Sequence, residues 1–151
     1  GLVNSFIMKK TFILLVVAII SISCDRELAR VDLLKENAKE VFFDLEAEEV
    51  IELYVDIDIV FKEPPLFVYH CALKQDGNLL FEGGTDPLTT TLNENESKVT
   101  TIDGFTHWKF FGKLDGDLKA SKDDVYSIKT TFLKNEDPNL IVKKAQIVFL
   151  K

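Results

Sequence analysis

The strongest alternation of apolar and polar residues lies between residues 51 and 61 and predicts a strand with one buried face. Every second position there is apolar: Ile51, Leu53, Val55, Ile57, Ile59 and Phe61. The next apolar run, from Leu66 to Leu73, is apolar on both faces except at His70 and predicts a central strand. Pro64-Pro65 separates the two runs, because proline cannot donate to the ladder of a sheet.

Turn sequences divide the rest of the chain into further short strands. Gln75-Asp76-Gly77-Asn78 predicts a tight hairpin turn, because glycine and asparagine tolerate the positive φ that such turns need. Gly83 to Ser97 is expected to be a long polar loop with one short edge strand near 88–92, and a natural place for a partner to bind. Further strands are expected at 78–82, 99–102, 105–114, 125–133 and 140–150.

Before these strands, the apolar residues recur at spacings of three and four, which is the period of a helix. They are Leu28, Val31, Leu34, Ala38, Val41, Phe42 and Leu45. We therefore expect a helix from about Glu27 to Asp44, within an N-terminal helical segment at 24–48. The alternative is that Val41-Phe42-Phe43 opens the first strand.

Short strands separated by turns, without a strand-helix-strand rhythm, predict a mainly β domain at 49–151. The expected architecture is an antiparallel β-sandwich of the immunoglobulin-like or transthyretin-like kind, with the N-terminal helix added. A small β-barrel is the alternative.

The start of the chain has a different character. Met8-Lys9-Lys10 is followed by the apolar stretch Phe12 to Ile20 and the run Ser21 to Cys24, which is the charged, apolar, small order of a secretory signal. The apolar stretch is shorter than the roughly 20 residues that a permanent membrane-spanning helix needs. We expect residues 8–23 to be a cleaved signal peptide and residues 1–7 to be an upstream remnant.

This start resembles the signals of bacterial lipoproteins, in which a small residue precedes a lipid-accepting cysteine. Ser23-Cys24 carries the resemblance, which covers only the first 24 residues. It implies a lipid anchor on Cys24, with palmitate among its acyl chains, and a place in the cell envelope. We favour the outer membrane or the periplasmic face over the inner membrane. The alternative is an ordinary signal peptide that leaves Cys24 as a plain thiol.

The formal net charge of −7 becomes two units more negative when Lys9 and Lys10 leave with the signal. An acidic chain argues against nucleic acid as a partner, because phosphate binding needs a basic surface. If Cys24 carries lipid, Cys71 has no partner for an intramolecular disulfide. Because Cys71 lies in the apolar run 66–73, we expect it to be a buried thiol.

Paired groups that could support catalysis are few. Asp56 and Asp58 share one face of a predicted strand, where the backbone repeat places them roughly 6.5 to 7 Å apart. Two carboxylates at this distance can support glycoside hydrolysis. The simpler interpretation is that both belong to a solvated strand face. His70 and Cys71 are neighbours on one strand, so their side chains point to opposite faces. The fold could still bring Cys71 and His107 together as a catalytic pair, but no local motif supports this pairing. We predict no catalytic residue.

No metal site or cofactor is predicted either. A calcium site could form from the carboxylates of Asp115-Gly116-Asp117 and Asp123-Asp124. The sequence lacks the alternating ligands of a calcium-binding loop, so a plain turn is favoured. The two histidines and Cys71 show no ligand spacing for zinc.

Aromatic residues offer the remaining candidates for binding. Trp108 shares a predicted strand face with Phe110, and packing in the core is the simplest interpretation. The functional alternative is that Trp108 and Tyr69 form an exposed platform for a sugar ring or another small ligand. The overall expectation is a non-enzymatic binding or scaffolding module for a protein partner in the envelope. Capture of a carbohydrate or small ligand is the alternative, and an unrecognised hydrolase is a third.

Overall fold

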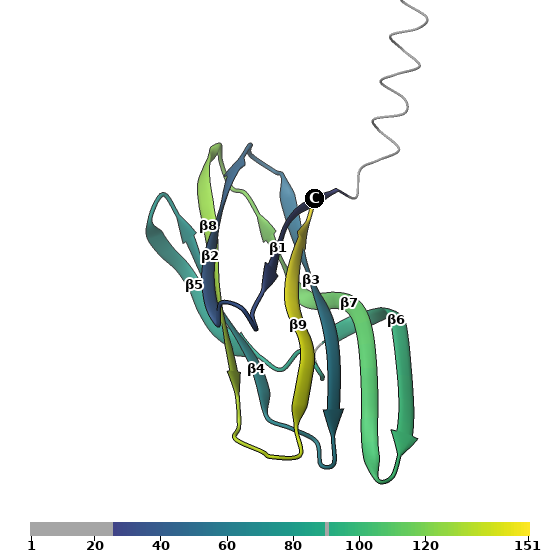
Figure 1. Ribbon diagram of the computed structural model, residues 1–151. Coiled ribbons are helices and arrows are strands. Elements are labelled where there is room, and N and C mark those ends of the chain that lie inside the picture. Colours follow the sequence, from purple (N-terminus) through teal and green to yellow (C-terminus); the bar gives the residue numbers. More distant parts are fainter. Residues whose placement is uncertain (1–25, 90) are drawn as a thin grey trace, which may run out of the picture.

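The computed structural model describes residues 26–89 and 91–151, which form strands joined by turns (Figure 1). The strands are β1 Glu27–Asp32, β2 Ala38–Leu45, β3 Val50–Phe61, β4 Phe67–Gln75, β5 Asn78–Thr85, β6 Thr91–Ile102, β7 Phe105–Lys119, β8 Asp124–Lys134 and β9 Ile141–Leu150. The prediction of a mainly β fold is confirmed.

The strands form two antiparallel sheets. The five-stranded sheet has the order β1-β9-β3-β7-β6, and the four-stranded sheet has the order β2-β8-β4-β5. Figure 1 shows them side by side, with the upper part of β7 continuing beyond the end of β6. Within the described residues the strands do not close into a barrel, so the barrel alternative is wrong.

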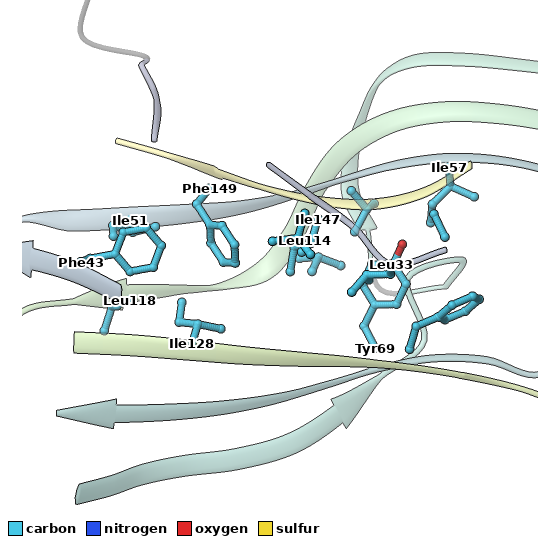
Figure 2. Close-up of a cluster of buried hydrophobic side chains, with 14 of the residues drawn as sticks. Leu33, Phe43, Ile51, Ile57, Tyr69, Leu114, Leu118, Ile128, Ile147 and Phe149 are labelled. Carbon is cyan, nitrogen blue, oxygen red and sulfur yellow. The ribbon is translucent and has the colours of Figure 1, made fainter. Parts of the chain in front are cut away.

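The core lies between the two sheets (Figure 2). The alternation in β3 places Ile51, Val55, Ile57 and Ile59 in this core with no exposed surface. Phe149 of β9 meets Phe43 of β2 edge to face, with 5.2 Å between ring centroids, so the two sheets contact each other directly. β4 is a central strand between β8 and β5, as its apolar pattern predicts.

The helix expected from Glu27 to Asp44 is wrong, and so is the helical segment at 24–48 as far as the structure describes it. The chain there forms β1, a turn and β2. The Asp32 carboxylate accepts a hydrogen bond from the Leu34 backbone N–H at 3.0 Å, and its carbonyl accepts two more, which closes the turn. The alternative placed Val41-Phe42-Phe43 at the opening of the first strand; these residues do lie in a strand, but they lie inside β2, the second one.

Both hairpin turns have positive φ angles at an Asp-Gly pair, as predicted for the turn from Gln75 to Asn78. Asp76 and Gly77 have φ of 49° and 77°, and Asp103 and Gly104 have φ of 53° and 81°. The long loop expected from Gly83 to Ser97 is wrong: β5 continues to Thr85, and β6 begins at Thr91.

No helix within the described residues is long and apolar enough to cross a membrane.

Candidate functional site

An apolar groove opens between β5 and the upper part of β7, and we call it the β5–β7 groove. Its volume is about 320 Å³, and the buried side chains of Leu114, Leu118 and Ile128 contribute to its lining. Cys71 of β4 and Phe81 of β5 line it as well. Ligand pockets in proteins occupy roughly 300–1,000 Å³, so the groove has room for one large side chain or a small ligand.

Glycine residues of β5 help to keep this groove open. Gly83 lies opposite Cys71 in the β4–β5 ladder and carries no side chain that could fill the space. A Cβ atom at Gly83 would stand 3.0 Å from Cζ of Phe81, so the Phe81 ring lies against the backbone of Gly83. Any larger residue at position 83 would push this ring away from its place beside the groove.

The strand beside the groove exposes three consecutive apolar side chains. Leu79, Leu80 and Phe81 are 54%, 53% and 63% exposed. Within the described chain β5 pairs only with β4, so no described strand covers its other edge along Leu79 to Glu82. The sequence of β5 contains no lysine or proline, which are the residues that commonly protect an edge strand. We call the three side chains the β5 surface.

The only charged residue of β5 is Glu82, which lies on the opposite side of the strand from the groove. Its Oε1 atom is 3.3 Å from Nε2 of His70 on β4. Because side chains alternate along a strand, Leu80 lies on the same side of β5 as Glu82, whereas Phe81 points toward the groove. The β5 surface therefore spans both faces of this edge strand.

Cys71 lies partly buried in the wall of the groove, which agrees broadly with the burial expected for it. Burial raises the pKa of the thiol, while Thr130, with Oγ1 3.9 Å from Sγ, acts weakly in the other direction. A thiol with a raised pKa carries little thiolate at neutral pH, so Cys71 is a poor nucleophile. His107 lies on β7 on the face opposite to core-packed Trp108, so the structure does not bring it to Cys71.

A second hollow lies on the outer face of the five-stranded sheet. It is a broad depression of about 790 Å³, lined by residues that include Asp56, Lys98, Lys109 and Lys144. Asp56 accepts a hydrogen bond from Arg30 at 2.9 Å and lies 3.6 Å from the Lys144 ammonium group. Asp56 therefore belongs to a structural charge network, which supports the strand-face interpretation of the Asp56 and Asp58 pair.

Tyr69, expected as a possible ligand platform, is buried in the core instead (Figure 2). Its hydroxyl donates a hydrogen bond to the backbone oxygen of Gln146 at 3.3 Å, and its ring contacts those of Phe67 and Phe132. Burial, with smaller contributions from nearby negative groups, raises the pKa of Tyr69 far above its usual value. A buried side chain cannot stack on a sugar ring, so the expectation of an exposed platform is wrong at this residue.

The raised pKa of Tyr69 predicts a loss of stability at alkaline pH. The unfolded chain ionises this group near pH 10, whereas the folded protein keeps it protonated. The stabilisation is therefore fully present below about pH 10 and falls above it by up to about 1.4 kcal/mol per pH unit. Urea unfolding at about pH 8 and about pH 11 should show a smaller loss for Tyr69→Phe than for the wild type. Equal losses would contradict this role.

Trp108, the other candidate platform, packs against the core and is only partly buried. Its indole N–H donates to Oγ of Ser97 at 3.2 Å, and its ring lies 4.6 Å from that of Phe110. The core interpretation accounts for these contacts. Trp108 and Tyr69 lie on different sheets, and the structure does not make them one binding surface.

The acidic residues expected as a possible calcium loop are separated in the structure. Asp115 and Asp117 line the β5–β7 groove, whereas Asp123 accepts a hydrogen bond from the Ala47 backbone N–H at 2.8 Å. Hydrogen bonds from the Val125 N–H and the Gln75 amide lower the pKa of Asp124. Among the residues that the structure describes, no three metal-ligating side chains gather into a site.

Sequence reasoning missed the β5 surface and the groove. The signal that could have found the surface is the run Leu79-Leu80-Phe81 directly after the Asp76-Gly77 turn, since consecutive apolar residues cannot all face the core from one strand. The groove has no such signal, because it depends on where two distant strands end. Cys24, the expected lipidation site, lies outside the described residues.

No protein-family model, curated protein or solved structure matches this chain. The functional argument therefore rests on the sequence of the first 24 residues and on the geometry of β5 and β7.

Proposed function

We propose that this chain is a lipid-anchored, non-enzymatic binding module of the bacterial cell envelope that docks a protein partner on its β5 surface. The single observation that carries the docking site is the exposure of Leu79, Leu80 and Phe81 on an edge strand. Contiguous exposed apolar residues beside unpaired backbone groups favour association with another polypeptide. The order of charged, apolar and small residues up to Cys24 supports the anchor.

The anchor would hold the domain close to the membrane. β1 begins at Glu27, so only Asp25 and Arg26 separate the first strand from Cys24. A partner of such a domain would be another envelope protein. We further propose that the two sheets belong to the immunoglobulin-like or transthyretin-like sandwiches, for which two antiparallel sheets around one core are the support.

Capture of a carbohydrate is the weaker proposal. It relied on Tyr69 and Trp108, and the burial of Tyr69 removes half of the expected platform. The depression around Asp56 is broad and open, and its charges are partly neutralised by one another.

The proposed docking site can be tested with two residues of equal exposure in the same sheet. Leu80 and Leu133 are both 53% exposed, but only Leu80 belongs to the β5 surface. Crosslinking in the native envelope with Leu80→Asp should recover at least about tenfold less partner, because a carboxylate would have to be desolvated at the interface. Leu133→Asp should recover as much partner as the wild type.

Both variants should keep the wild-type melting temperature within a few degrees, since neither side chain is buried. Full partner recovery with Leu80→Asp would contradict docking on β5. Failure to recover any defined partner with the wild-type chain would contradict the binding function itself.

A further inference from the structure

The upper end of β7 is a second unprotected edge, and it borders the β5–β7 groove. Within the described residues, the β6–β7 ladder reaches only to Leu114 of β7. Beyond that point β7 continues through Asp115 to Lys119 with β3 on one side and no strand of the described residues on the other. The five-stranded sheet is therefore one strand narrower at this end.

The direction of the backbone groups along this edge follows from the hydrogen bonds of Ala120. Its N–H donates to the Glu49 carbonyl and its carbonyl accepts from the Glu48 N–H, both at 2.8 Å, so both groups point toward the β3 side. Backbone groups of an extended chain alternate in direction. Those of Leu118 therefore point toward β3 as well, and those of Asp117 and Lys119 point toward the open edge.

Phe81 shows what this narrowing leaves uncovered. Its register partner on β4 is Leu73, which packs against the core, so Phe81 points toward the inner side of its sheet. An inward-pointing phenylalanine in a sandwich is normally covered by the facing sheet, yet Phe81 is 63% exposed. A strand placed beside Asp115–Lys119 would lie on the inner side of β5 and close the mouth of the groove.

We propose that the protein partner contributes one extended segment, which adds as a strand to the Asp115–Lys119 edge of β7 and inserts an apolar side chain into the β5–β7 groove. This inference rests on the proposed function and specifies how the partner is recognised. Strand addition combines backbone hydrogen bonds along an edge with pockets for alternate side chains, and the structure offers both. The segment therefore carries large apolar residues at alternate positions.

Charge complementarity specifies the segment further. Asp115 and Asp117 both line the groove, and the domain as a whole is acidic. Lys113 lies 3.3 Å from Asp117, whereas no ion pair with Asp115 occurs among the described residues. A lysine or arginine beside the apolar residues of the segment fits this rim, and an acidic segment does not.

The test compares two substitutions of one residue. Lys119→Pro removes the backbone N–H that points toward the open edge and leaves the β3 ladder intact, because proline is tolerated at an unpaired edge position. Lys119→Ala removes the same side chain, with its 2.9 Å ion pair to Glu48, but keeps the N–H. Each full-length variant is crosslinked in the native envelope beside the wild type, and circular dichroism checks the fold.

The expected result is at least about a tenfold loss of partner recovery with Lys119→Pro and less than about a twofold change with Lys119→Ala. Equal recovery with both variants and the wild type overturns strand addition while leaving docking on β5 intact. Equal loss with both variants also overturns it, because the side chain would then be responsible. Crosslinks that join only copies of this chain overturn the assignment of the segment to a partner. No defined partner with the wild type counts against the proposed function instead.

A second measurement covers the case in which Lys119→Pro does not fold. The purified full-length protein is treated with repeated additions of N-ethylmaleimide at alkaline pH, because the raised pKa of Cys71 makes its thiol react slowly at neutral pH. Once Cys71 in the groove wall carries the bulky adduct, the protein is returned to envelope extract. The adduct should abolish partner recovery, whereas Cys71→Ser protein should recover the same amount of partner with and without the reagent. Mass spectrometry of the peptide 63–74 verifies that Cys71 is modified. If the modified protein still recovers as much partner as the untreated protein, insertion into the groove is overturned.

Discussion

Replacing Phe43 by alanine is expected to lower the free energy of unfolding by about 3–5 kcal/mol. Phe43 is 6% exposed, and its ring meets that of Phe149 on the facing sheet at 5.2 Å and an interplanar angle of 63°. The substitution removes apolar contact from both sheets and leaves a cavity that two hydrogen-bonded ladders cannot close by collapsing. Urea unfolding followed by circular dichroism measures the loss.

The neighbouring residue provides the control. Phe42 has the same side chain on the same strand but is 66% exposed, so Phe42→Ala should change the free energy of unfolding by no more than about 0.5 kcal/mol. Similar losses for both variants would contradict the assignment of the two residues to opposite faces of β2.

The period of two in β3 was sufficient to predict its strand and its buried face. Ile51, Val55 and Ile57 are fully buried because their spacing matches the alternation of a strand and the facing sheet covers them. The hairpin turns were predictable for a similar reason. Asp76-Gly77 and Asp103-Gly104 supply local backbone geometry that needs little from the rest of the fold.

The N-terminal segment shows how a short pattern can mislead. Residues spaced by three and four can also arise from two short strands joined by a turn, since one face of each strand and the turn all contribute apolar residues. Val41, Phe43 and Leu45 have the period of two in β2, and Leu33 enters the core from the turn itself. Pairing of β1 with β9 and of β2 with β8 then decides the outcome, and no local propensity contains that information.

The polar stretch from Asn93 to Ser97 shows the opposite error. Its composition suggests a loop, yet its backbone belongs to β6 and pairs with β7. Backbone pairing in a ladder does not require apolar side chains when a long partner strand is already in place. The candidate site was unpredictable for a related reason, because the β5–β7 groove exists only where the β6–β7 ladder ends at Leu114 and glycines face it from β5.

Replacing Cys24 by alanine is expected to abolish incorporation of labelled palmitate and to release the protein from the membrane. Without the anchor, the described residues contain no helix that could span a bilayer, and an acidic domain gains nothing from anionic lipids. The released protein should keep the wild-type unfolding free energy, because the first buried core residue in the described part of the chain is Val31. Label incorporation, membrane fractionation and urea unfolding measure the three effects.

The chain supplies its own control for this experiment, since Cys24 and Cys71 are its only cysteines. Cys71→Ala should retain full lipid labelling and membrane association, and should lose some stability because it removes a sulfur atom from the wall of the β5–β7 groove. The two variants therefore separate anchoring from folding: Cys24→Ala changes location alone, and Cys71→Ala changes stability alone. Continued palmitate labelling of Cys24→Ala, or its loss in Cys71→Ala, would show that Cys24 is not the lipid-accepting residue.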